Sequence, residues 1–340
     1  MRASANDHVT DARFSAWRVV VTLLLVTVIV LIAVGLYEAY RPRRQEAMSA
    51  TDALYYTTHR YGTREAAQTH YVLLISSAYT NGDVWRLLLR HHWPSSTPTG
   101  DTALHFIVPD LLGTGRSPWP SLARQPDAYT VESHAAALLR VLRSAVPAGA
   151  PLHIAGICFG GVLALHLAAQ VKPASLTLLS TPYFESGEAA WSTGEQHAIW
   201  YRQPWLINLY IRAVARQRWL CGSLLRRGVA LKCPKLGAVS DAYCDASPEA
   251  LRQSLLDVSC RYRPQRAALR VGSLHVPTLC VRGERSLLCN DARNARLLAD
   301  TGARGLVVRG RGASHNVFLR QPQLVMSAMH EFITSIIIGR

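Results

Sequence analysis

The chain has 340 residues, 49% of them apolar, which is enough to form the core of one large α/β domain with an inserted subdomain. Its 37 Lys and Arg residues outnumber its 22 Asp and Glu residues, so the formal net charge is +15, which favours anionic partners such as a membrane surface. No zinc-finger spacing, aromatic RNA-binding strand motif or Lys/Arg block is present, so nucleic acid is not an expected partner.

A continuous apolar run near the N-terminus predicts a membrane anchor. Residues 19–37 contain no charge and, as one helix, would extend about 28 Å, close to the thickness of a bilayer's hydrocarbon core. Trp17 and Tyr37 stand where interfacial aromatic side chains are common. A cleaved signal peptide is the alternative, but the run is longer than a signal core and no small-x-small cleavage site directly follows it. We therefore expect a polar tail at 1–18 and a retained, single-pass transmembrane helix.

Two indirect features bear on which side of the membrane the rest of the chain lies. Three arginines flank the anchor on either side, so the positive-inside rule does not decide the orientation. The seven cysteines show no paired spacing of the kind found in disulfide frameworks, and no Asn-x-Ser/Thr glycosylation sequence is present. Both features favour a cytosolic catalytic domain.

From residue 71 onward, short apolar runs alternate with helical periods. The predicted strands are 71–76, 105–108, 152–155, 175–179, 278–282 and 305–309, and the predicted helices are 131–145, 159–170, 291–300 and 322–337. Such alternation is typical of an α/β fold, in which a mostly parallel sheet is covered by helices on both faces. We expect a core domain at 71–183 and 276–340, preceded by a connector at 38–70 with an early strand near 54–58.

The segment 184–275 interrupts this alternation. It is rich in Trp, Tyr, Arg and Cys and shows no clear strand, which predicts a helical insertion above the carboxyl edge of the sheet, that is, a lid. Within it, residues 204–219 have one apolar helical face, so this helix either packs on the core or touches lipid. Its cysteines lack metal-ligand spacing, and we predict neither a metal nor a cofactor.

The sharpest local motif is Gly156-Ile157-Cys158-Phe159-Gly160-Gly161, which stands between an apolar strand and an apolar helix. This arrangement is typical of a nucleophile elbow, a strained strand-to-helix turn that needs small residues two before and two after the nucleophile. The N-terminus of the helix that follows would also stabilise an anionic sulfur. The alternative is a buried structural cysteine. We predict that Cys158 is the nucleophile.

Residues 71–184 resemble the α/β-hydrolase superfamily. The run VPDLLGTGRSPWP (108–120) looks like the loop after the fourth strand of capped hydrolases. YTVESHAAALLRVL (129–142) and SLTLLSTPYF (175–184) resemble the bodyguard-type hydrolases and their bacterial relatives, which carry serine at the position of Cys158. The elbow GICFGG is similar to those of dienelactone hydrolases and polyhydroxyalkanoate synthases, which use cysteine. The resemblance implies an α/β-hydrolase fold with acyl-transfer chemistry.

The resemblance also implies the other members of the site, because the family order is nucleophile, acid and histidine. His315, in the run 312–316, matches the family's catalytic histidine. The acid usually stands three residues after the glycine that ends a strand, but residue 286 is serine; Asp291 and Glu284 are the nearby carboxylates, and we rank Asp291 first. Cysteine tolerates a missing acid better than serine does, since a thiolate–imidazolium pair would keep the nucleophile charged.

The oxyanion hole of the family uses a His-Gly pair after the third strand, where this chain has Ser76-Ser77-Ala78-Tyr79. Because the donors are backbone N–H groups, the change alters the side chains of the loop rather than the donors. We expect Ala78, or Ser77, to act together with Phe159.

Three functions are compatible with these features. The first is hydrolysis of an ester or thioester, with a small-molecule or lipid-like acyl group carried on Cys158; the anchor and the Trp-rich insertion favour a long apolar acyl chain. The second is transfer of the same acyl group to an alcohol or thiol. The third is a non-catalytic binding or scaffold protein on a hydrolase fold, which the absent acid and the altered oxyanion loop would suit.

Overall fold

The computed structural model describes residues 25, 26, 28, 29, 32, 33, 48–63, 66–78, 80–95, 101–184, 246–286 and 288–339. Most of the predicted anchor at 19–37 and the predicted helix at 204–219 therefore lie outside the described residues. Within the part that is described, none of the helices combines the length and the apolar character that crossing a bilayer requires.

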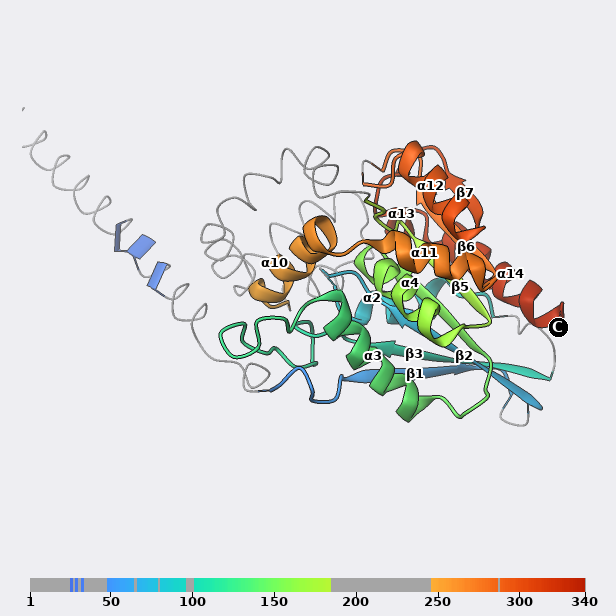
Figure 1. The fold of residues 1–340 in the computed structure, drawn as a ribbon, viewed down its shortest axis with the longest axis horizontal. Helices are drawn as coiled ribbons and strands as arrows, with labels where there is room; N and C mark the ends of the chain where they lie inside the picture. The colour runs from blue at the N-terminus through green and yellow to red at the C-terminus, as the bar shows by residue number, and fades with distance from the viewer. Residues whose placement is uncertain are drawn as a thin grey trace, which may run out of the picture.

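A seven-stranded sheet forms the centre of the domain, in the order β1-β3-β2-β4-β5-β6-β7 (Figure 1). Only β1 runs antiparallel to its neighbour, so the predicted mostly parallel sheet is confirmed. The strands are β1 (Tyr56–Tyr61), β2 (Gln68–Ile75), β3 (Thr102–Pro109), β4 (Leu152–Ile157), β5 (Ser175–Leu179), β6 (Thr278–Gly283) and β7 (Arg304–Val308). The central strands are buried on both faces, which is why they read as continuous apolar runs.

Helices cover both faces of the sheet. They are α2 (Asp83–His92), α3 (Val131–Ala145), α4 (Phe159–Val171), α10 (Pro248–Leu256) with a π-helical turn at Asp257–Arg261, α11 (Pro264–Ser273), α12 (Asp291–Thr301), α13 (Val317–Arg320) and α14 (Pro322–Ile338). Helix α2 packs with α14 on one face, while α3, α4, α11 and α12 form a continuous layer on the other. This arrangement confirms the α/β fold, with helices on both faces of a mostly parallel sheet, that the alternation predicted.

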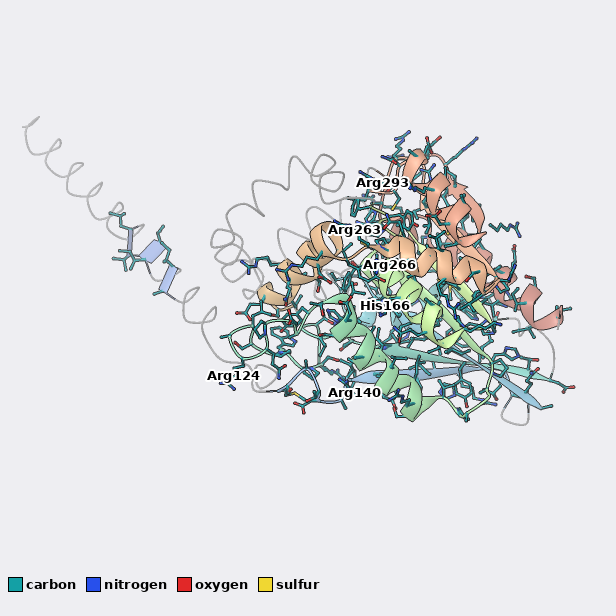
Figure 2. All side chains as sticks on the ribbon, in the orientation of Figure 1. Arg124, Arg140, His166, Arg263, Arg266 and Arg293 are labelled. Atoms are coloured by element: carbon teal, nitrogen blue, oxygen red, sulfur yellow. The ribbon has the colours of Figure 1, made fainter. Side chains whose placement is uncertain are left out.

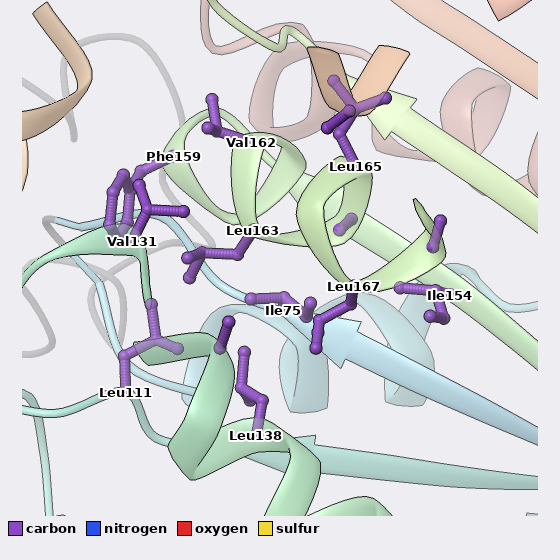
Figure 3. Close-up of a cluster of buried hydrophobic side chains, with 14 of the residues drawn as sticks. Ile75, Leu111, Val131, Leu138, Ile154, Phe159, Val162, Leu163, Leu165 and Leu167 are labelled. Carbon is purple, nitrogen blue, oxygen red and sulfur yellow. The ribbon is translucent and has the colours of Figure 1, made fainter. Parts of the chain in front are cut away.

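Helix α4 is apolar around most of its circumference, with His166 and Gln170 as its polar residues, because it is buried between the sheet and its neighbouring helices. Figure 3 shows Leu163 and Leu167 of α4 beside Ile75 and Ile154 of the sheet, with Leu138 of α3 in the same cluster. All five side chains are fully buried or nearly so. The helix that carries the elbow at its N-terminus is therefore fixed by packing along its length.

Two predicted boundaries differ from the structure. Strand β1 and the start of β2 lie within the predicted connector at 38–70, so the core begins before residue 71. At the other end of the insertion, α11 packs between α4 and α12 although it lies within the predicted lid at 184–275. Its buried residues are few and small, among them Ala267 and Ala268, so its sequence lacks the apolar run expected of a core helix.

Candidate active site

Cys158 occupies the sharp turn between β4 and α4. Its backbone has φ 52° and ψ −114°, a conformation that costs a non-glycine residue free energy and that the surrounding structure must hold. A Cβ at Gly156 would overlap the carbonyl of Gly160, and a Cβ at Gly160 would overlap the carbonyls of Ile75 and Ser76. The small residues of the motif therefore let the turn press against the end of β2, as the elbow interpretation requires.

The thiol of Cys158 is almost completely buried, with 8% of the residue exposed. Burial raises the pKa of Cys158 to about 11, while hydrogen bonds from the Phe159 N–H and the Ser77 side chain oppose that rise. The Phe159 N–H thus faces the sulfur. The sequence indicates Ser77 only as a backbone donor, and its side-chain contact with the sulfur arises because the loop after β2 approaches the elbow.

The loop after β2 carries the second predicted oxyanion donor, Ala78, which is buried. Two hydrogen bonds shape this loop: the Thr80 N–H donates to the Ser77 carbonyl at 3.1 Å, and the Ser76 hydroxyl donates to the Asn81 carbonyl at 2.9 Å. Since Ser77 contacts the Cys158 sulfur, Ala78 follows directly after a residue that touches the nucleophile. A serine turn here takes the place of the family's His-Gly pair.

His315 lies in the loop between β7 and α13, near the start of the last helical segment. Its Nδ1 shares a hydrogen bond with the Ser286 Oγ at 3.2 Å and lies 3.9 Å from the Cys289 Sγ. The Cys289 Sγ–H donates to the Thr181 carbonyl at 3.2 Å, so this sulfur is left to accept from the imidazole. The network therefore favours a proton on Nδ1 and leaves the lone pair of Nε2 available as a base.

The predicted acids do not reach this network. The carboxylate of Asp291 forms an ion pair with Arg282, and its side chain is 93% exposed. Glu284 is exposed and serves the turn after β6 through its backbone, whose N–H donates to the Val308 carbonyl at 2.9 Å. Among the described residues, neither carboxylate hydrogen bonds to His315. The position opposite Nδ1 is filled by Ser286, the residue that the family spacing assigns to the acid.

The electrostatics of the site are those of two neutral groups. Desolvation lowers the pKa of the partly buried His315 to about 4, and burial holds the thiol of Cys158 near pKa 11. Burial, and then the nearby Cys158, raise the pKa of Cys289 to about 12. Near neutral pH the pair is therefore thiol and imidazole, in place of the thiolate–imidazolium pair that we expected. The reason is that burial disfavours the charged form of each group.

The order of these parts along the chain, and the fold that carries them, match one known family. A model of the alpha/beta hydrolase family matches residues 72–328. The chain belongs to the alpha/beta hydrolase family. This match identifies the family as a whole. It does not distinguish a bodyguard-like subtype or a cysteine nucleophile.

Among curated proteins, the chain is similar to Lipase LipV of Mycobacterium tuberculosis, with 34% identity over 110 residues. The similar region covers 32% of this chain and 34% of the lipase, so the chain spans about a third of the relative that it matches. This likeness and the family together support the prediction of a hydrolase.

Solved structures show the same fold at low sequence identity. A putative lipase from Acinetobacter baumannii matches with a TM-score of 0.61 and 18% identity, covering 91% of this chain and 97% of that one. A peroxisomal alpha-beta-hydrolase from Saccharomyces cerevisiae gives a TM-score of 0.64 and 16% identity, with coverage of 88% and 87%. The enol-lactonase from Burkholderia xenovorans gives 0.59 and 18%, with coverage of 84% and 99%.

Proposed function

We propose that this chain is a membrane-anchored acyl hydrolase that cleaves an ester or thioester through an acyl-cysteine on Cys158. The position of Cys158 carries the proposal: it stands at a strained elbow, it faces the Phe159 N–H, and the family places the nucleophile there. The lipase name of the curated relative and the apolar run at 19–37 support a lipid-like substrate that is reached from a membrane surface. The cysteine elbow within a bodyguard-like sequence makes the thiol the distinguishing feature of this member.

Because the Cys158 thiol and the His315 imidazole are both neutral, the first step must include a proton transfer. As the Cys158 Sγ attacks the carbonyl carbon, its proton passes to the Nε2 of His315, so that the new C–S bond and the imidazolium form together. The carbonyl oxygen becomes an oxyanion, which the Phe159 and Ala78 N–H groups would stabilise. The C–O or C–S bond of the substrate then breaks, and the proton on Nε2 passes to the leaving alcohol or thiol. Water attacks the acyl-cysteine with His315 again as the base, and this releases the carboxylic acid and restores the thiol.

The test uses the full chain in a neutral detergent with p-nitrophenyl esters and acyl thioesters of graded acyl length. We expect turnover that increases with chain length, and an adduct of one acyl group seen by intact mass spectrometry. Both should disappear in Cys158→Ala and persist in Cys280→Ala, which removes another buried thiol from the same sheet. Turnover that survives in Cys158→Ala would contradict the proposal.

The same experiment separates the other two functions. An adduct that decays only after an alcohol or thiol acceptor is added would identify an acyltransferase. The scaffold function is favoured by one observation, the neutral Ser286 at the acid position. If the wild-type chain forms no adduct at any acyl length, the scaffold replaces the hydrolase. Resistance of the chain to extraction from membranes at high pH, lost on removal of residues 1–37, would test the anchor independently.

A further inference from the structure

A surface cavity of about 630 Å³ lies on the outer side of the helix layer, between α4 and α11. Figure 2 shows Arg263 and Arg266, from the start of α11, close to His166 of α4. Tyr262 and Gln170 contribute further polar groups to the wall. The wall of the cavity thus comes from helices α3, α4 and α11 and from the turn before α11.

The cavity is strongly basic. Its lining includes four arginines within ten residues of chain, namely Arg261, Arg263, Arg266 and Arg270, and one carboxylate, Glu132. Three positive charges are therefore left without a compensating charge in the lining. Within the described part of the chain, no ion pair is formed by Arg261, Arg266 or Arg270. The nearby carboxylate of Asp257 accepts the Val131 N–H at 2.8 Å, and Arg261 acts on it only at longer range.

The remaining wall supplies neutral hydrogen-bonding groups. The Nδ1 of His166 and the hydroxyl of Tyr262 share a hydrogen bond of 2.9 Å, which fixes both rings against the cavity. Burial lowers the pKa of His166 and raises that of Tyr262, so both are uncharged near neutral pH. Helix α11 starts at the cavity with Pro264, and its first turn contains no acidic side chain. The partial positive charge of its N-terminus is therefore not offset locally.

The cavity is distinct from the candidate active site. Cys158 precedes the first residue of α4, whereas His166 and Gln170 lie about 12 and 18 Å further along the helix axis. Neither His315, nor Ser286, nor any residue of the oxyanion loop lines the cavity. A ligand bound there would not touch the acyl group on Cys158.

We propose that this cavity binds a phosphate-bearing group, which is either the head group of an anionic lipid or a soluble phosphorylated molecule. A carboxylate is satisfied by one guanidinium, whereas a phosphate presents three acceptor oxygens and up to two charges, which suits several arginine forks around one space. The proposal does not depend on catalysis by Cys158. If the source is lipid, the cavity docks the helix layer on an anionic membrane.

Arginine footprinting on the full chain tests the proposal. The chain in neutral detergent micelles is treated with phenylglyoxal, either alone, with phosphatidylglycerol in the micelles, or with inorganic pyrophosphate, and each arginine is followed by peptide mass spectrometry. We expect one probe to slow modification of Arg266 and Arg270 by about fivefold or more, with the exposed Arg304 and Arg309 as internal controls. Protection by phosphatidylglycerol alone identifies a lipid head group, and protection by pyrophosphate identifies a soluble ligand. No protection by either probe, or equal protection of the controls, overturns the proposal.

A matched pair of double variants provides the second measurement. Arg266→Gln/Arg270→Gln removes two charges from the cavity, and Arg304→Gln/Arg309→Gln removes two charges from the exposed surface at β7 and the loop that follows it. The dissociation constant of the protective probe should rise about tenfold or more in the cavity variant and less than about twofold in the control. Thermal unfolding verifies that both variants are folded. Equal weakening in the two variants would show a general charge effect and would contradict a built site.

Discussion

The elbow around Cys158 and the loop after β6 lie at the same edge of the sheet, yet they follow the family pattern to different degrees. The elbow keeps its small residues, its strained backbone and an N–H facing the sulfur. The loop after β6 keeps its place beside His315 but presents the hydroxyl of Ser286 and the thiol of Cys289 in place of a carboxylate. The elbow has both the strained turn and a hydrogen-bond donor at the sulfur, whereas the loop after β6 has the position of the acid without its carboxylate.

The difference separates the two tasks of a catalytic acid. Ser286 and Cys289 can orient the imidazole and favour a proton on Nδ1, which is the positioning task. Neither carries charge near neutral pH, so neither can stabilise the imidazolium, which is the electrostatic task. Burial lowers the pKa of His315 to about 4, and neither Ser286 nor Cys289 supplies a charge that would oppose this shift. Each prediction that follows tests one side of this contrast.

The largest expected effect is the loss of the base. His315→Ala should lower kcat/KM by about a thousandfold, since it removes the base that takes the proton from a thiol whose pKa is about 11. The measurement is ester turnover by the full chain, with the exposed His91→Ala as the matched control. Similar activity in the two variants would mean that the elbow works without its histidine.

The second effect concerns the reactivity of the elbow thiol. At about pH 8, alkylation of Cys158 by iodoacetamide should be on the order of a hundredfold slower than that of a free cysteine, because little thiolate is present. The rate should rise with pH until it levels off near the pKa of about 11. Peptide mass spectrometry of quenched samples follows the reaction. A rate that levels off below pH 7 would reveal a thiolate–imidazolium pair and would overturn the neutral description.

The third effect is a gain. Ser286→Asp places a carboxylate opposite Nδ1 and should raise kcat/KM by about tenfold, whereas the uncharged Ser286→Asn should not. The acid limb of the wild-type pH profile should lie near pH 4, because catalysis needs neutral His315 and protonation removes it. The carboxylate favours the imidazolium, so this limb should move to higher pH in Ser286→Asp only. Coincident profiles for all three proteins would exclude an electrostatic role for this position.

The smallest effect is expected for the carboxylates outside the network. Asp291→Asn and Glu284→Gln should each change kcat/KM by less than about twofold, because neither side chain hydrogen bonds to His315. Asp291→Asn also removes the ion pair with Arg282, so thermal unfolding should accompany the assay. A loss of tenfold or more in either variant, with stability unchanged, would restore that residue as the acid.

Local pattern was enough to predict most of the fold, the elbow turn at Cys158 and the loop that carries His315. Buried parallel strands appear as apolar runs, and a nucleophile elbow requires small residues at fixed offsets, so both are visible without coordinates. The glycine-rich run before His315 is equally local: Gly310 and Gly312 have positive φ and shape the loop. In each case, the residues that carry the sequence motif are the same residues that form the structural feature.

Tertiary structure alone decided what surrounds those residues. Ser286 and Cys289 meet His315 from a loop 26 to 29 residues earlier in the chain, and Asp291 turns instead to Arg282. The pKa values of Cys158 and His315 depend on how much water the surrounding elements exclude, which no single segment encodes. The basic cavity between α4 and α11 also depends on tertiary packing. Residues distant in the chain become neighbours only when the helix layer packs, so their joint chemistry exists only in the folded domain.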